Sequence, residues 1–115
     1  MKKYLALYIA PRGEIDKFMA LPDDEKAKQM GADMEKWTKW DADHKKDIVD
    51  LGAPLGKTKK ITKDGATDAK NELTGYTVLQ AESYDDAVKV FDGHPHFNFP
   101  GSTIEIMELL SIDGD

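Results

Sequence analysis

The 115-residue chain contains no cysteine, no long apolar run and no cluster of basic residues. Without cysteine it forms no disulfide, thiolate metal site or cysteine nucleophile, which fits a reducing compartment, so we expect a cytoplasmic protein. No stretch offers the roughly 20 apolar residues that cross a bilayer, so we expect no membrane partner. Sixteen basic and 22 acidic residues give a net charge of −6, which disfavours nucleic acid as a partner.

The composition that remains is that of one soluble globular domain. Hydrophobic residues make up 40% of the chain and charged residues 33%. A chain of this length buries a core of useful size. We therefore expect a single domain over residues 1–115, with a frayed tail at Asp113–Asp115.

The order of hydrophobic patterns predicts the fold class. Strand-like segments are expected at 3–10, 55–62, 75–82 and 103–110, and a polar connection centred on Asp64-Gly65 at 63–72. Helical periodicity is expected as one turn near Ile15, as a long helix over 23–51 with a break near Gly31, and at 84–91. The order β-α-β-β-α-β predicts an α+β, ferredoxin-like split βαβ fold with two helices on one face of an antiparallel sheet.

The first strand has apolar residues on both faces. Tyr4 and Tyr8 lie on one face, and Leu5 and Leu7 lie on the other. Because the helices cover only one face, the other predicts a second sheet and hence a homodimer. The alternative is a monomer in which small side chains and a loop hide that face.

The long helix carries a stripe of side chains expected to point at the sheet. Asp41 and His44 interrupt this stripe three residues apart, side by side on one helical face. Either they line a partly wet pocket, or the helix is exposed at this end and both are solvated. The full stripe consists of Met30, Met34, Trp37, Asp41, His44, Ile48 and Leu51.

A His94-Pro95-His96 turn follows the second helix, which begins at a capping-box-like Ser83. Three interpretations stay open: packed loop histidines, a general acid or base held by the proline, or metal ligands together with His44. The chain has three histidines in all. Our prediction is a site without metal or cofactor.

Two tryptophans, Trp37 and Trp40, lie on the same helix as Asp41. They either stack on a flat ligand or fill the helix–sheet or dimer interface. We select Trp37, Trp40 and His96 as candidate ligand-binding residues. His94, Asp41 and His44 are the candidate catalytic residues.

Several short motifs occur in an order that resembles the YCII-related family, nearer its DGPF-like branch. They are Met1–Leu5, Trp37-x-x-Trp40, Leu51–Leu55, Asp64-Gly65, Thr74–Leu79, Ser83–Ala87, His94-Pro95 and Ile104–Ile106. The resemblance spans nearly the whole chain. It departs from the branch at its name-giving motif, where Asp64-Gly65 is followed by Ala66-Thr67.

The resemblance implies a dimeric α+β barrel with a cleft between helices and sheet. Shorter members look like enzymes with a His–Asp dyad, a relative is a dehydrochlorinase of a chlorinated hydroxyquinone, and some branch members are associated with sigma factors. For this sequence the resemblance implies a dyad that is reversed, Asp41 with His94, or that consists of two histidines.

The function expected from these residues is binding of a small polar or aromatic molecule by a homodimer. The chain is expected to be a cofactor-independent lyase or hydrolase that uses a His/Asp pair. The alternative is a non-catalytic ligand-binding or regulatory module that uses the same pocket.

Overall fold

The computed structural model describes residues 1–112 of the chain. The strands are β1 (Lys2–Ile9), β2 (Ile48–Asp50), β3 (Thr58–Thr62), β4 (Gly65–Ala69), β5 (Leu73–Ala81) and β6 (Thr103–Glu108). The helices are α1 (Arg12–Met19), α2 (Asp23–Asp43), α3 (Tyr84–Val90) and the short 3-10 helix η1 (Pro95–Asn98). Within the described residues, no helix combines the length and the apolar character needed to cross a membrane.

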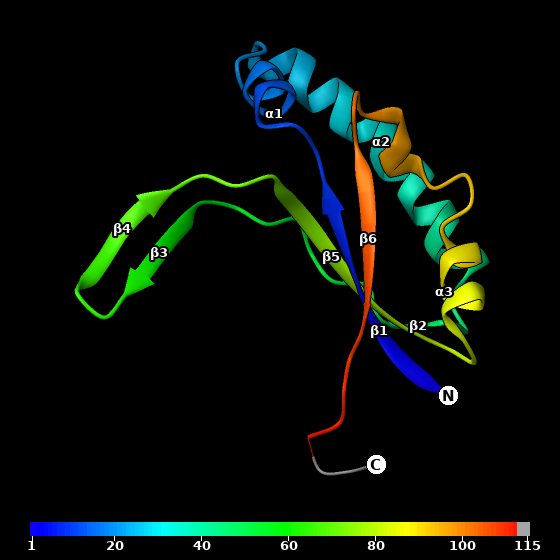
Figure 1. The fold of residues 1–115 in the computed structure, drawn as a ribbon. Coiled ribbons are helices and arrows are strands. Elements are labelled where there is room, and N and C mark those ends of the chain that lie inside the picture. The colour runs from blue at the N-terminus through cyan, green and yellow to red at the C-terminus, as the bar shows by residue number, and fades with distance from the viewer. Residues whose placement is uncertain (113–115) are drawn as a thin grey trace.

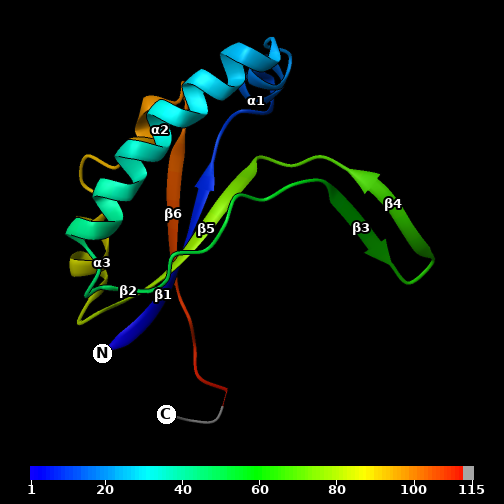
Figure 2. The ribbon, with the colours of Figure 1, turned by 180° about the vertical axis from the view of Figure 1, so that it is seen from behind.

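Four of the strands form one antiparallel sheet in the order β2-β5-β1-β6. The longest strands, β1 and β5, therefore lie in the centre, paired from Lys2 with Ala81 to Ile9 with Leu73. The helices lie along one side of this sheet (Figures 1 and 2). This strand order is that of the ferredoxin-like split βαβ fold, so the predicted α+β class is confirmed.

The core lies between the sheet and the helices, where β1 alternates between buried and half-buried residues. Tyr4, Ala6 and Tyr8 are buried on the helix-facing side. Trp40 of α2 packs in the same core and donates a 3.0 Å hydrogen bond from Nε1 to the carbonyl oxygen of Val90. This bond joins the ends of α2 and α3 above the sheet.

The start of α3 follows the capping chemistry predicted for Ser83. The Ser83 hydroxyl accepts a 3.2 Å hydrogen bond from the backbone N–H of Asp86, which satisfies one of the free donors at the helix start. Past the last turn, Gly93 adopts a φ of +67°, the left-handed conformation that glycine tolerates best. The chain thus turns at Gly93 and enters the His94-Pro95-His96 segment.

The predicted extent of the long helix was wrong. α2 runs unbroken through Gly31 and ends at Asp43, so Ile48 and Leu51 lie outside it. The reason is tertiary pairing, because Ile48 pairs with Leu79 and provides the sheet with its edge strand β2.

The second strand of the sheet was also assigned to the wrong residues. Segment 55–62 holds β3, and the expected polar connection holds β4. These strands pair only with each other, Thr58 with Ala69 through Thr62 with Gly65, and form a separate hairpin. We call residues 57–70 the arm; in Figure 1 it projects away from the helices. The tail predicted at Asp113–Asp115 lies outside the described residues.

Candidate functional site

The His94 side chain begins the short helix η1. Its Nδ1 accepts a 2.9 Å hydrogen bond from the backbone N–H of His96, while Pro95 occupies the first helical position, where no N–H is needed. The His-Pro-His spacing therefore has a local structural cause. It fixes the imidazole with Nδ1 toward the backbone and Nε2 toward the interior.

Aromatic rings surround the His94 imidazole, which is only 2% exposed. Trp37 and Trp40 approach edge-on, with ring centroids 4.5 and 4.4 Å from that of His94. Tyr8 stacks on the imidazole at 5.1 Å, and Phe91 lies tilted at 5.6 Å. We call these four rings the aromatic box.

The box determines the protonation state of His94. Burial, followed by the charges of His96 and His44, lowers the pKa of His94 from 6.5 to about 3. The imidazole is therefore neutral near pH 7, and because Nδ1 accepts a hydrogen bond, the proton sits on Nε2. This Nε2–H is buried and has no hydrogen-bond partner among the described residues. His94 is thus suited to donate a hydrogen bond rather than to accept a proton.

His96 holds two strands together. Its Nε2 lies 3.0 Å from the carbonyl oxygen of Ile9 and 3.1 Å from that of Thr103, at the end of β1 and the start of β6. Burial lowers the pKa of His96 more than these two carbonyl contacts raise it. The side chain is 8% exposed and forms part of the wall of the larger groove described below.

Tyr8, one of the four rings of the aromatic box, is held in place by a buried chain of hydrogen bonds. The Thr77 hydroxyl donates to the carbonyl oxygen of Leu51 at 2.8 Å, so the Tyr8 hydroxyl donates to Thr77, also at 2.8 Å. Burial raises the pKa of Tyr8 to about 12, although the bond to Thr77 lowers it. Tyr8 is therefore a rigid, neutral floor for the His94 ring.

Asp41 and His44 lie at the end of α2, and both are half-buried. The His44 ring lies 5.2 Å from that of Trp40, at the rim of the box. Among residues 1–112, Asp41 forms no hydrogen bond or ion pair with His44 or His94 through its side chain. The structure thus places His44 near the box but does not join Asp41 and His94 in a dyad.

Two hollows lie on either side of η1. The larger, which we call the groove, has a volume of about 1500 Å³ and is lined by Trp37, His96, α1 and the base of the arm. The smaller, about 280 Å³, is lined by Trp40 and His44. Pro95 borders both hollows, so the His94 box forms the partition between them.

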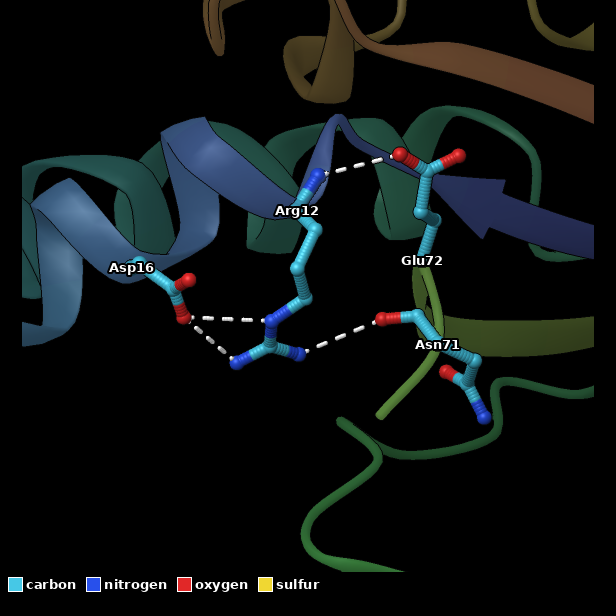
Figure 3. Close-up of polar contacts among 4 residues, drawn as sticks. All are labelled: Arg12, Asp16, Asn71 and Glu72. Carbon is cyan, nitrogen blue, oxygen red and sulfur yellow. Dashed lines mark hydrogen bonds and ion pairs between the residues drawn. The ribbon is translucent and has the colours of Figure 1, made fainter. Parts of the chain in front are cut away.

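Arg12 lines the groove on the side of α1. Figure 3 shows its contacts with Asp16, Asn71 and Glu72. Its Nε and Nη2 donate to Asp16 Oδ1 at 3.1 and 2.9 Å, and its Nη1 donates to the Asn71 carbonyl oxygen at 3.2 Å. The Arg12 backbone N–H donates to Glu72 Oε2 at 3.0 Å. These bonds tie the first turn of α1 to the segment that joins the arm to β5.

Sequence reasoning missed Tyr8, Thr77, Phe91 and Arg12. Tyr8 and Thr77 lie on the buried side of strands with alternating burial. This alternation predicts that a residue is buried, but not whether it belongs to a functional site. Phe91 follows the last residue of an amphipathic helix, and its position likewise predicts only that it is buried. Arg12 follows Pro11 in what appeared to be only a strand-ending turn.

The described residues contain no group of three or more histidine, aspartate or glutamate side chains placed to hold a metal ion. Fold and site together define a ferredoxin-like α+β domain with a sealed, neutral histidine beside an open groove.

Neither protein-family models nor curated proteins match the chain. Among solved structures, it is similar to 5-chloro-2-hydroxyhydroquinone dehydrochlorinase from Burkholderia phenoliruptrix AC1100, in complex with 2,5-dihydroxybenzoquinone. The identity is 16%, the match covers 98% of this chain and 99% of that chain, and the TM-score is 0.47.

Proposed function

We propose that this chain binds a small polar or aromatic molecule in the groove beside His94, as a homodimeric member of the YCII-related family. The family assignment is supported by motifs that fall on this site. Trp37 and Trp40 form two sides of the box, and His94-Pro95 forms the partition between the hollows.

The observation that carries the proposal is the buried Nε2–H of His94, which has no acceptor within residues 1–112. A buried donor without a partner costs about 1–3 kcal/mol. A flat molecule with a carbonyl, phenolate or carboxylate oxygen supplies that acceptor, and its ring packs on the indoles. Because Nε2 is sealed, the ligand enters by displacing Trp37, the ring that the box shares with the groove.

In the catalytic form of the proposal, the protein is a cofactor-independent lyase or hydrolase. His94 donates its Nε2 hydrogen to an oxygen that gains negative charge in the transition state. Asp41 or His44, both half-buried at the rim, orients or protonates the ligand once it is bound. Trp37, Trp40 and His96 orient the ligand.

A specific observation favours the alternative, a binding module without catalysis. The Asp41 carboxylate has no hydrogen bond to either histidine among the described residues. The acid and base are therefore not assembled in the ligand-free protein, although catalytic hydrogen bonds often tighten only on binding.

Isothermal titration calorimetry with 2,5-dihydroxybenzoquinone tests the binding site, because this probe is planar and carries oxygen acceptors. We expect His94→Phe, which keeps a ring and removes the donor, to raise Kd about tenfold, the equivalent of one hydrogen bond. His94→Gln keeps a donor and should lie between the two. Phe97→Ala, at an exposed ring on η1, is the control and should bind like the wild type.

Equal affinity of His94→Phe and wild-type protein would remove His94 from the binding site. Turnover of 5-chloro-2-hydroxyhydroquinone, which unlike the probe carries a chlorine that can leave as chloride, separates the two forms of the proposal when chloride release is measured. Asp41→Asn and His44→Gln should lower kcat at least about tenfold if these groups transfer protons. Tight binding without turnover supports the module.

A further inference from the structure

The arm, residues 57–70, has no core of its own. In β3 and β4 every residue is exposed except Thr58 and Ala69, which are half-exposed. Ile61, in the middle of the ladder, is 79% exposed. An isolated two-stranded hairpin is at best marginally stable in water. The arm therefore needs a surface to pack on.

The first half of α2, residues 23–36, also lacks a covering surface, and we call it the α2 overhang. Every residue in it except Lys26 is exposed, and Met30 and Met34 are 55% and 65% exposed. Met30 and Met34 were expected to lie on the sheet, but the first part of α2 extends beyond the sheet (Figure 1). Trp37 is the first residue of the predicted stripe that packs against the core.

The overall dimensions reflect these two projections. The radius of gyration is 16.0 Å. A compact domain of this length is expected to have about 13 Å. The radius of gyration is larger than expected because the arm and the start of α2 both extend from the body of the domain.

The chemistry of the two surfaces is complementary. The arm has five lysines and two aspartates, a net charge of +3, and exposes Ile61. The α2 overhang has five acidic residues and three lysines, a net charge of −2, and exposes two methionines. Apolar contact flanked by opposite charges is the usual composition of a protein interface.

The two surfaces do not meet within one chain. The groove between them is lined on the helix side by Gln29, Ala32 and Asp33, whereas Met30 and Met34 are not part of its wall. On the arm side the lining residues come from the base of the ladder and exclude Ile61. The apolar parts of both surfaces are therefore available to another molecule.

We propose that the arm of one protomer packs on the α2 overhang of a second copy of this chain, with Ile61 against Met30 and Met34. The contact is reciprocal, so a two-fold axis closes it without forming a fibre. This contact goes beyond the proposed function. It places the partner's arm on α2, the helix whose residues Gln29 and Asp33 line the groove. The ligand site is then bordered by both protomers.

The absence of cysteine from the chain allows a direct test. Single variants Ile61→Cys and Met34→Cys are mixed under mild oxidation and separated by non-reducing electrophoresis. We expect a disulfide-linked heterodimer that forms at least about tenfold faster than with the control pair of Ile61→Cys and Val88→Cys. Val88 is 53% exposed on α3, which matches Met34 in accessibility but lies on another helix.

Equal rates for the two pairs would overturn the proposal. So would a double variant, Ile61→Cys with Met34→Cys, that closes its disulfide within a single chain. Rising salt should slow the heterodimer reaction, because part of the attraction between arm and overhang is Coulombic. This readout needs no ligand, so a failed titration at His94 leaves it unaffected.

Discussion

The three histidines of this chain differ because their surroundings differ. His94 is sealed by rings, His96 bonds two carbonyl oxygens, and His44 lies half-buried at a helix end. From the sequence we selected His94 and His44 as catalytic and His96 as ligand-binding, but the sequence does not show which ring nitrogen of each histidine has a hydrogen-bond partner. The capping bond to Nδ1 is the decisive detail, and it depends on backbone geometry.

Acid should destabilise the protein through His94. Its folded-state pKa of about 3 lies below the ordinary 6.5, so between these values the unfolded chain binds the proton and the folded protein does not. Stability is then complete above pH 6.5 and falls as pH decreases toward 3, by up to about 1.4 kcal/mol per pH unit. Urea unfolding at several pH values gives the free energy of unfolding as a function of pH. Between pH 6.5 and 3 this free energy should fall less steeply in His94→Gln than in the wild type. If the free energy of unfolding falls equally steeply with decreasing pH in both proteins, His94 is already protonated in the folded protein.

Periodicity predicted that Trp37, Trp40 and the sheet would come together, because a helix must bury its apolar stripe. It did not predict where the helix ends. Lys45 and Lys46 are good helix formers, and the visible stop signal lies at Gly52. The helix ended earlier because Ile48 pairs with β5, so Asp41 and His44 lie near the helix end rather than in its middle.

At the scale of elements, the fold was predicted better than its boundaries. β1, β5, α3 and β6 were found within a few residues, since each has a clear pattern and a clear stop. The arm was misread, because a lysine-rich strand looks like any sheet edge until its partner is known. Local patterns predict that a strand forms and leave open which strand it pairs with.

Gly31 is a test of the unbroken α2 helix. A methyl group added there meets no atom within 4 Å. Gly31→Ala should therefore raise the free energy of unfolding by about 0.5–1 kcal/mol, because alanine loses less backbone entropy in a helix. Thermal and urea unfolding measure this change, and a loss of stability would indicate a helix broken at Gly31.

Gly52→Ala is the opposing control. Gly52 has a φ of +80°, and an added Cβ would lie 1.8 Å from the carbonyl oxygen of Tyr76. The backbone must shift to accept it, so we expect a loss of more than about 2 kcal/mol.

At the scale of the whole molecule, none of the helices in residues 1–112 lies over one face of the sheet (Figure 1). Leu5 lies between Val78 and Met107 in the register, and the three form a half-exposed to exposed apolar row on the side away from the helices. We propose that a second copy of the sheet covers this surface in the homodimer.

Leu5→Arg should weaken this association, because it places a charge in the middle of the apolar row. We expect the dimer dissociation constant, measured by analytical ultracentrifugation, to rise at least about tenfold. Val88→Arg, on the exposed side of α3, should leave it unchanged. If Leu5→Arg and the wild type self-associate alike, this face does not hold the copies together.

The aromatic box has a practical consequence. The two tryptophans of the chain both contact His94. Nearly all of the protein's intrinsic fluorescence therefore comes from side chains that contact that imidazole. A protonated imidazole quenches indole emission, and water entering the box shifts it to the red. The protein therefore carries its own optical reporter for whatever displaces those rings.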